Sequence, residues 1–231
     1  MKNTISLLLL LVLVSCSPES NTQNKQEDAS SETEQITPAT EEEASAPEQE
    51  VAPPVFTIID KCEFDLSQLS YEGELRTQKC WLDAKGENIV LFSGQEDLAK
   101  GEATVYAYHY LLNDGQATLL KDLNATVDDC ADADLFLDFN EQAFAITDLD
   151  EDNIGEITFA YRTACVTDVS PHDLVLHLFE NGQDYSLVGN TNVRVGAEER
   201  MGGDVSETYF DSAPASFLTH ANEVWEKIKQ Y

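Results

Sequence analysis

Residues 103–120, ATVYAYHYLLNDGQATLL, decide the fold of this chain. Apolar and aromatic residues recur in short runs on both sides of Asn113-Asp114-Gly115, and these runs have the length of β-strands. Asn, Asp and Gly tolerate the positive φ angles that a tight hairpin turn requires. The stretch therefore predicts two antiparallel strands, 103–112 and 117–120, joined by a hairpin turn.

The same pattern of short apolar runs and turn residues extends in both directions from this hairpin. Lys85-Gly86 and Asn181-Gly182 are two further turn signals. The other predicted strands are 55–59, 88–92, 135–139, 143–147, 157–162, 174–179 and 185–188. We therefore expect a mainly β domain of the α+β class, with antiparallel, hairpin-rich sheets arranged as a sandwich or as propeller-like blades.

The end of the chain has a helical periodicity instead. Its apolar residues after Asp211-Ser212-Ala213-Pro214 are Phe217, Leu218, Ala221, Val224, Trp225 and Ile228. Asp211 or Ser212 can cap such a helix, and Pro214 suits its first turn. We expect one C-terminal amphipathic helix whose apolar side packs on a sheet face.

The first residues have the layout of a secretory signal. A basic start at Lys2 precedes an apolar run over 5–14, which is too short to cross roughly 30 Å of hydrocarbon. The run ends on Leu13-Val14-Ser15-Cys16, which resembles the bacterial lipobox. That resemblance implies a signal peptide at 1–15 and a lipid-anchored Cys16, held stably because several acyl chains insert. A soluble secreted protein is the alternative.

The lipid anchor implies a bacterial cell-envelope protein with a membrane as its partner. Ser17 is not the Asp that retains enteric lipoproteins in the inner membrane, so the resemblance implies the outer membrane. Residues 16–54 are rich in Ser, Thr, Glu, Gln, Pro and Ala, and predict a disordered tether before a single domain at 55–231. With 44 acidic and 13 basic residues, the net charge of −31 excludes a nucleic-acid partner.

Four cysteines remain after lipidation: Cys62, Cys80, Cys130 and Cys165. An even number in an exported domain predicts two disulfides. Of three possible connectivities we favour Cys62 with Cys80 and Cys130 with Cys165, because each pair flanks a predicted hairpin or strand pair. Thiol metal sites and thiol catalysis are disfavoured, because there is no Cys-x-x-Cys and the histidines form no motif. Those histidines are His109, His172, His177 and His220.

The segment with the clearest chemistry is 145–159, AITDLDEDNIGEITF. Its carboxylates stand at relative positions one, three, five and nine, which are Asp148, Asp150, Asp152 and Glu156. A backbone carbonyl at position seven, that of Ile154, would add a further oxygen. Alternating oxygen ligands of this kind suit a hard cation, and we predict calcium. A solvated acidic turn is the alternative.

This loop differs from an EF-hand because Phe159 stands at position twelve and because the flanks are β-like. It resembles the calcium hairpins of integrin-type and propeller-type proteins, although Asn153 replaces their usual Gly. Asn still tolerates a left-handed backbone. A second acidic cluster is expected to be a solvated loop: Asp128, Asp129, Asp132 and Asp134. Asp168 could approach the metal loop if Cys130 and Cys165 pair.

Several segments together resemble a family of bacterial exported proteins that carries a surface polysaccharide biosynthesis label. They are Trp81-Leu82-Asp83, Gly86-Glu87-Asn88-Ile89, 147–159, Cys165 with 168–171, Met201-Gly202-Gly203-Asp204 and Trp225-Glu226-Lys227. The resemblance implies an accessory role in the cell envelope, and it transfers no catalytic residue to this chain.

Three functional hypotheses follow. The first is a non-catalytic envelope lipoprotein with a structural calcium hairpin. The second is a carboxylate-dependent enzyme that acts on envelope glycans with an acid and a base from the acidic loops. The third is an adhesion or partner-binding module, which an exposed patch of Tyr106, Tyr108 and Tyr110 would indicate. Alternation along one strand face favours burial of these tyrosines.

Overall fold

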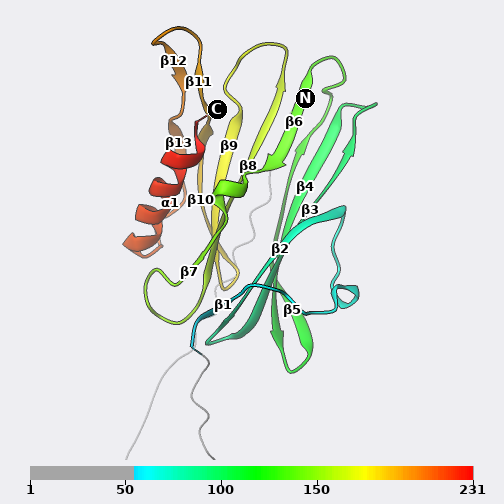
Figure 1. Cartoon of the computed structure of the whole chain (residues 1–231), viewed down its shortest axis with the longest axis vertical. Helices are drawn as coiled ribbons and strands as arrows, with labels where there is room; N and C mark the ends of the chain where they lie inside the picture. Colours follow the sequence, from blue (N-terminus) through cyan, green and yellow to red (C-terminus); the bar gives the residue numbers. More distant parts are fainter. Residues whose placement is uncertain (1–54, 231) are drawn as a thin grey trace, which may run out of the picture. The chain divides into compact units, whose positions relative to one another are not determined.

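The computed structural model describes residues 55–230 (Figure 1). The predicted signal peptide, Cys16 and the whole of the predicted tether lie outside the described residues. Within 55–230, no helix combines the length and apolar character needed to cross a membrane.

The first sheet is an antiparallel meander preceded by a short edge strand. Its order is β1-β2-β3-β4-β5. The strands are β1 (Thr57–Ile59), β2 (Glu74–Asp83), β3 (Gly86–Asp97), β4 (Glu102–Asn113) and β5 (Gln116–Val127). The turn between β4 and β5 has φ angles of 52° at Asp114 and 75° at Gly115, which confirms the predicted hairpin.

The second sheet is also antiparallel, with the order β13-β10-β9-β8-β6 and with β7 beside β8 on the edge that β6 also uses. Its strands are β6 (Asp134–Phe139), β7 (Ala145–Thr147), β8 (Glu156–Val166), β9 (Asp173–Glu180), β10 (Gln183–Asn190) and β13 (Val205–Thr208). A separate two-stranded ribbon joins β11 (Asn192–Arg194) to β12 (Arg200–Gly202). Short 3-10 turns, η1 and η2, span Leu66–Gln68 and Glu141–Ala143.

The two sheets bury their facing sides against each other, as side-chain alternation along the strands requires. In β3, Val90 and Phe92 point into the core between the sheets, whereas Ile89 and Leu91 point to the opposite face. The second sheet contributes Ile157, Phe159 and Phe179 to the same core. The arrangement confirms a mainly antiparallel β fold, with two sheets packed face to face and not closed into a barrel.

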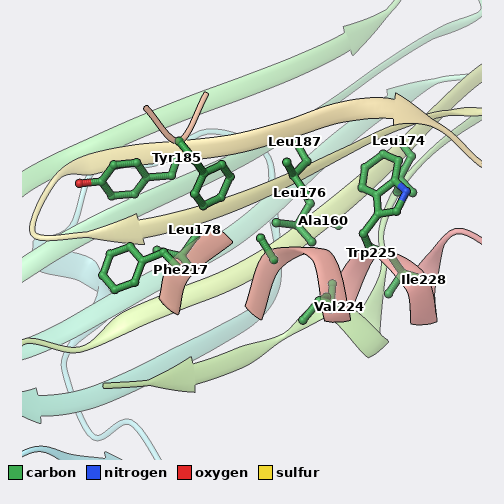
Figure 2. Close-up of a cluster of buried hydrophobic side chains, with 13 residues drawn as sticks. Ala160, Leu174, Leu176, Leu178, Tyr185, Leu187, Phe217, Val224, Trp225 and Ile228 are labelled. Carbon is green, nitrogen blue, oxygen red and sulfur yellow. The ribbon is translucent and has the colours of Figure 1, made fainter. Parts of the chain in front are cut away.

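Helix α1 (Ala215–Ile228) covers the other face of the second sheet (Figures 1 and 2). Phe217, Trp225 and Ile228 are at most 2% exposed and pack against leucines of β9 and β10. The helix therefore packs as predicted, but the predicted cap is wrong. Pro214 occupies the N-cap without a side-chain hydrogen bond, because Asp211 and Ser212 belong to a preceding turn closed by Phe210 and Ala213.

The outer face of the first sheet is covered by the segment that joins β1 to β2. Tyr106, Tyr108 and Tyr110 lie there and are buried, at 8%, 8% and 6% exposure. The Tyr108 hydroxyl accepts a hydrogen bond from the backbone N–H of Glu72 at 3.1 Å. The predicted burial is confirmed, and these tyrosines form no exposed aromatic patch.

Both favoured disulfides are present. Cys62 pairs with Cys80, with a Cα–Cα distance of 5.8 Å, and fastens the covering segment to β2. Cys130 pairs with Cys165, with a Cα–Cα distance of 5.6 Å, and fastens the loop between β5 and β6 to β8.

Strand β2 was absent from the predicted strands, as were β11, β12 and β13. The sequence of β2, ELRTQKCWLD, has exposed or half-buried residues over its first six positions, so it lacks a sustained apolar alternation. All four residues of β13 are exposed. Pairing with a neighbouring strand, rather than a local sequence pattern, determines these strands.

Candidate metal centre

The predicted metal loop connects β7 to β8, whose ends pair through Thr147 and Glu156. Its backbone takes positive φ at Glu151 (62°) and at Asn153 (64°). Asn153 thus adopts the left-handed conformation that a Gly supplies in related loops. The Asp152 carboxylate accepts a hydrogen bond from the backbone N–H of Ile154 at 2.7 Å, which tightens the curl.

The curl brings the predicted carboxylates together. Oxygens of Asp148, Asp150 and Glu156 lie within 4.8 Å of one another, close enough to hold one metal ion. Oxygens of Asp150, Asp152 and Glu180 form a second group with the same limit. Because Asp150 belongs to both, we treat these five residues as one group, the carboxylate cluster.

Glu180 was missed by the sequence reasoning. It is the last residue of β9, and its Cα pairs directly with that of Glu156 across the β8–β9 ladder. The signal that could have found it is the register of the β8–β9 ladder, which sets Glu180, the residue before the Asn181-Gly182 turn, opposite Glu156. Two like charges directly opposite each other on neighbouring strands are destabilising, so this pair needs a compensating positive charge or a proton.

Burial makes an uncompensated negative charge on Glu156 still more unfavourable. The Glu156 side chain is 0% exposed and accepts hydrogen bonds from Thr147 Oγ1 at 2.9 Å and from Leu149 N at 3.1 Å. Burial, and more weakly the neighbouring carboxylates, raise the pKa of Glu156 from 4.5 to about 8.

The same causes act on two other members of the cluster. Burial and the charges of Asp150, Asp152 and Asp148 raise the pKa of Glu180 to about 7. Burial and the charges of Asp152 and Asp148 raise the pKa of Asp150. Without a cation, the folded domain therefore favours protons on Glu156 and Glu180 near neutral pH.

Two buried oxygens in the cluster have no hydrogen-bond partner among the residues that the structure describes: Asp148 Oδ1 and Glu180 Oε1. Buried acceptors are normally paired, so each marks a place where a further ligand fits. An all-oxygen set of carboxylates suits a hard divalent cation. The carboxylates present thus fit a metal ion. The role of the Ile154 carbonyl as a further ligand stays a prediction.

No other acidic residue within 55–230 joins the cluster. Asp168 follows β8 at its far end, and the eleven residues of that strand separate it from Glu156 by roughly 35 Å. The expected approach of Asp168 is therefore wrong although its disulfide forms, because Cys165 lies near that far end. The second acidic group is exposed, as predicted for a solvated loop: Asp128, Asp129, Asp132 and Asp134.

The histidines lie mainly in the core. His109 is 0% exposed, and its Nε2 lies 2.9 Å from Asn88 Oδ1. His177 is 8% exposed, with its Nδ1 2.8 Å from Asp184 Oδ1. Burial lowers the pKa of His109 to about 4. His109 and His177 are thus buried residues, each in hydrogen-bond contact with one polar side chain.

The chain matched no protein-family model, no curated protein and no solved structure.

Proposed function

We propose that this chain is a non-catalytic bacterial envelope lipoprotein whose β-rich domain is stabilised by a calcium ion bound in the carboxylate cluster. The observation that carries the ion is the convergence of five carboxylates, two of which have buried oxygens without a partner. An ion there would offset the repulsion between Glu156 and Glu180 and fix the β7–β8 loop against β9.

Calcium suits the cluster better than other common ions do. Calcium accepts six to eight oxygens in flexible geometry, whereas magnesium demands a near-ideal octahedron. Zinc prefers nitrogen and sulfur, and the cluster offers neither. Exposed Asp150 and Asp152 leave the outer side of the loop open for an ion to enter.

Burial of Glu156 supports a structural role over catalysis. A glycoside hydrolase needs an acid and a base that both reach the substrate. The raised pKa of Glu156 would suit a general acid, and this favours the alternative of an enzyme that acts on envelope glycans. Its side chain, however, is 0% exposed and is bonded within its own loop.

Calorimetric titration of calcium into the full-length chain in detergent tests the ion. We expect binding for the wild type, binding weakened at least tenfold for Asp150→Asn, and no change for Asp168→Asn. Asp168→Asn is a matched control, because it removes one exposed negative charge at the other end of β8. Absence of calcium binding by the wild type would overturn the proposal.

The anchor and the envelope role need their own experiment. Cys16→Ser should abolish incorporation of labelled palmitate and move the chain from the detergent phase to the aqueous phase. Retention in the detergent phase without label would refute the anchor. If deletion of the protein reduces surface glycan, and Glu156→Gln restores it as fully as the wild type, glycan catalysis by this cluster is excluded.

A further inference from the structure

The metal loop joins two strands of the second sheet, but its backbone is hydrogen-bonded to the first sheet. Gly155 N donates to Asp83 Oδ2 at 3.1 Å, and Ala84 N donates to Asn153 O at 2.8 Å. Asp83 is the last residue of β2, and Ala84 begins the turn that leads to β3 in the first sheet. Asn153 and Gly155 lie between Asp152 and Glu156, so these two bonds fix the backbone that joins two proposed ligands.

Asp83 is the centre of this connection. It is 1% exposed, and its Oδ2 also accepts from Trp81 Nε1 at 2.9 Å and from Asn88 Nδ2 at 2.8 Å. Its Oδ1 accepts from the backbone N–H groups of Lys85 and Gly86, at 2.8 and 3.3 Å. Five donors thus satisfy one buried carboxylate, which makes its position well defined.

The residues behind Asp83 are equally constrained. Because Asn88 donates its amide N–H to Asp83, its Oδ1 is left to accept, so His109 Nε2 is the donor in their 2.9 Å contact. The His109 ring lies against Trp81, with ring centroids 5.2 Å apart. Asp83 is therefore backed by side chains of β2, β3 and β4 together.

The contact between loop and sheet is also close. A Cβ on Gly155 would overlap Trp81 Nε1 and would lie 2.8 Å from Phe56 Cε2. Only a residue without a side chain lets the loop approach near enough for its N–H to reach Asp83.

We propose that Asp83 is a positioning residue for the metal centre: from the opposite sheet, it holds the backbone between Asp152 and Glu156 in the conformation that binds calcium. The inference rests on the proposed function, since it presumes that the cluster binds calcium. It predicts that binding weakens when the hydrogen bond from Gly155 is lost, although Asp83 is not itself a member of the cluster.

Calcium titration of full-length variants in detergent tests the inference. Asp83→Asn puts a donor where the carboxylate now accepts five hydrogen bonds, and loss of a residue that supports metal ligands typically weakens affinity 10–100-fold. Tyr108→Phe is the control, since it removes a hydrogen bond of the same sheet, to Glu72, that does not involve the metal loop. We expect Asp83→Asn to raise the calcium Kd at least tenfold and Tyr108→Phe to leave it within twofold.

A second variant covers the case in which Asp83→Asn does not fold. Gly155→Ala leaves every residue of the first sheet unchanged, yet its methyl group would push the loop away from Trp81 and Asp83. It should raise the Kd by a similar factor. Suppose that the wild type binds calcium and that each variant that folds has a Kd within twofold of the wild-type value. This inference then fails while the proposed function stands. An equal loss in Tyr108→Phe would also overturn it, and a wild type that does not bind calcium refutes both.

Discussion

Without calcium, the domain should become more stable as the pH falls from 8 to 6.5. The pKa of Glu156 is raised from 4.5 to about 8 in the folded, metal-free domain. A raised pKa means that the folded state holds the proton more tightly than the unfolded chain does. This contribution is fully present below pH 4.5 and is lost as the pH rises through 8. Between pH 8 and 6.5 the gain from Glu156 is about 1.5 kcal/mol, or roughly 3–6 °C in Tm for a domain of this size.

Calcium should cancel most of this trend, because it binds the ionised carboxylates. Extracellular calcium modules have Kd values near 10⁻⁴ M, so 10 mM calcium at pH 8 would add about 2.7 kcal/mol, or about 5–10 °C. At pH 6.5, protons on Glu156 and Glu180 compete with the ion. With pKa values of about 8 and about 7, they weaken binding roughly 100-fold, which leaves an increment of about 2 °C or less.

The assay is a thermal melt of the full-length chain in detergent at both pH values, with 10 mM calcium or with chelator. His109 opposes this gain only weakly. Because burial lowers its pKa from 6.5 to about 4, its contribution falls by about 0.4 kcal/mol between pH 8 and 6.5, and most of the loss comes below pH 6.5. The reasoning is refuted if the chelated protein melts lower at pH 6.5 than at pH 8, or if calcium stabilises equally at both. Magnesium at the same concentration is the control for general ionic screening.

Three further outcomes test other parts of the structure. Glu180→Gln should raise the Tm in chelator at pH 8, because it removes the charge opposite Glu156, and should weaken calcium binding at least tenfold in calorimetry. Replacing both cysteines of Cys62–Cys80 by Ala should cost about 3 kcal/mol, and of Cys130–Cys165 about 4 kcal/mol, because their separations are 18 and 35 residues. A lower cost for the longer loop, read from urea midpoints, would contradict the chain-entropy account. Trp225→Ala should lower unfolding free energy by about 3–5 kcal/mol in urea, since the indole is 2% exposed; a change under 1 kcal/mol would mean that α1 is not docked.

The local sequence was sufficient to predict the structure wherever one short segment determines its own conformation. The Asp114-Gly115 turn was predictable because positive φ restricts the residues that can occupy it. The approach of the four carboxylates of residues 148–156 was predictable because a curl within nine residues brings them together.

Contacts between distant segments were not predictable in the same way. Glu180 joins the cluster only through the register of β8 on β9, and Asp83 reaches the loop only because the two sheets pack together. The cap at Asp211 or Ser212 was wrong because a local turn competes for those residues. Strand β2 was missed because its exposed first half breaks the alternation that identifies a strand.

The placement of the carboxylate cluster is costly for a domain that serves only as a scaffold. A buried glutamate opposite another glutamate destabilises the folded state at neutral pH unless a cation is present. An ion held there would contact the β7–β8 loop and β9 directly, and it would be coupled through Gly155 and Asp83 to the first sheet. One binding event would then stabilise both sheets, which favours a structural ion over a catalytic one.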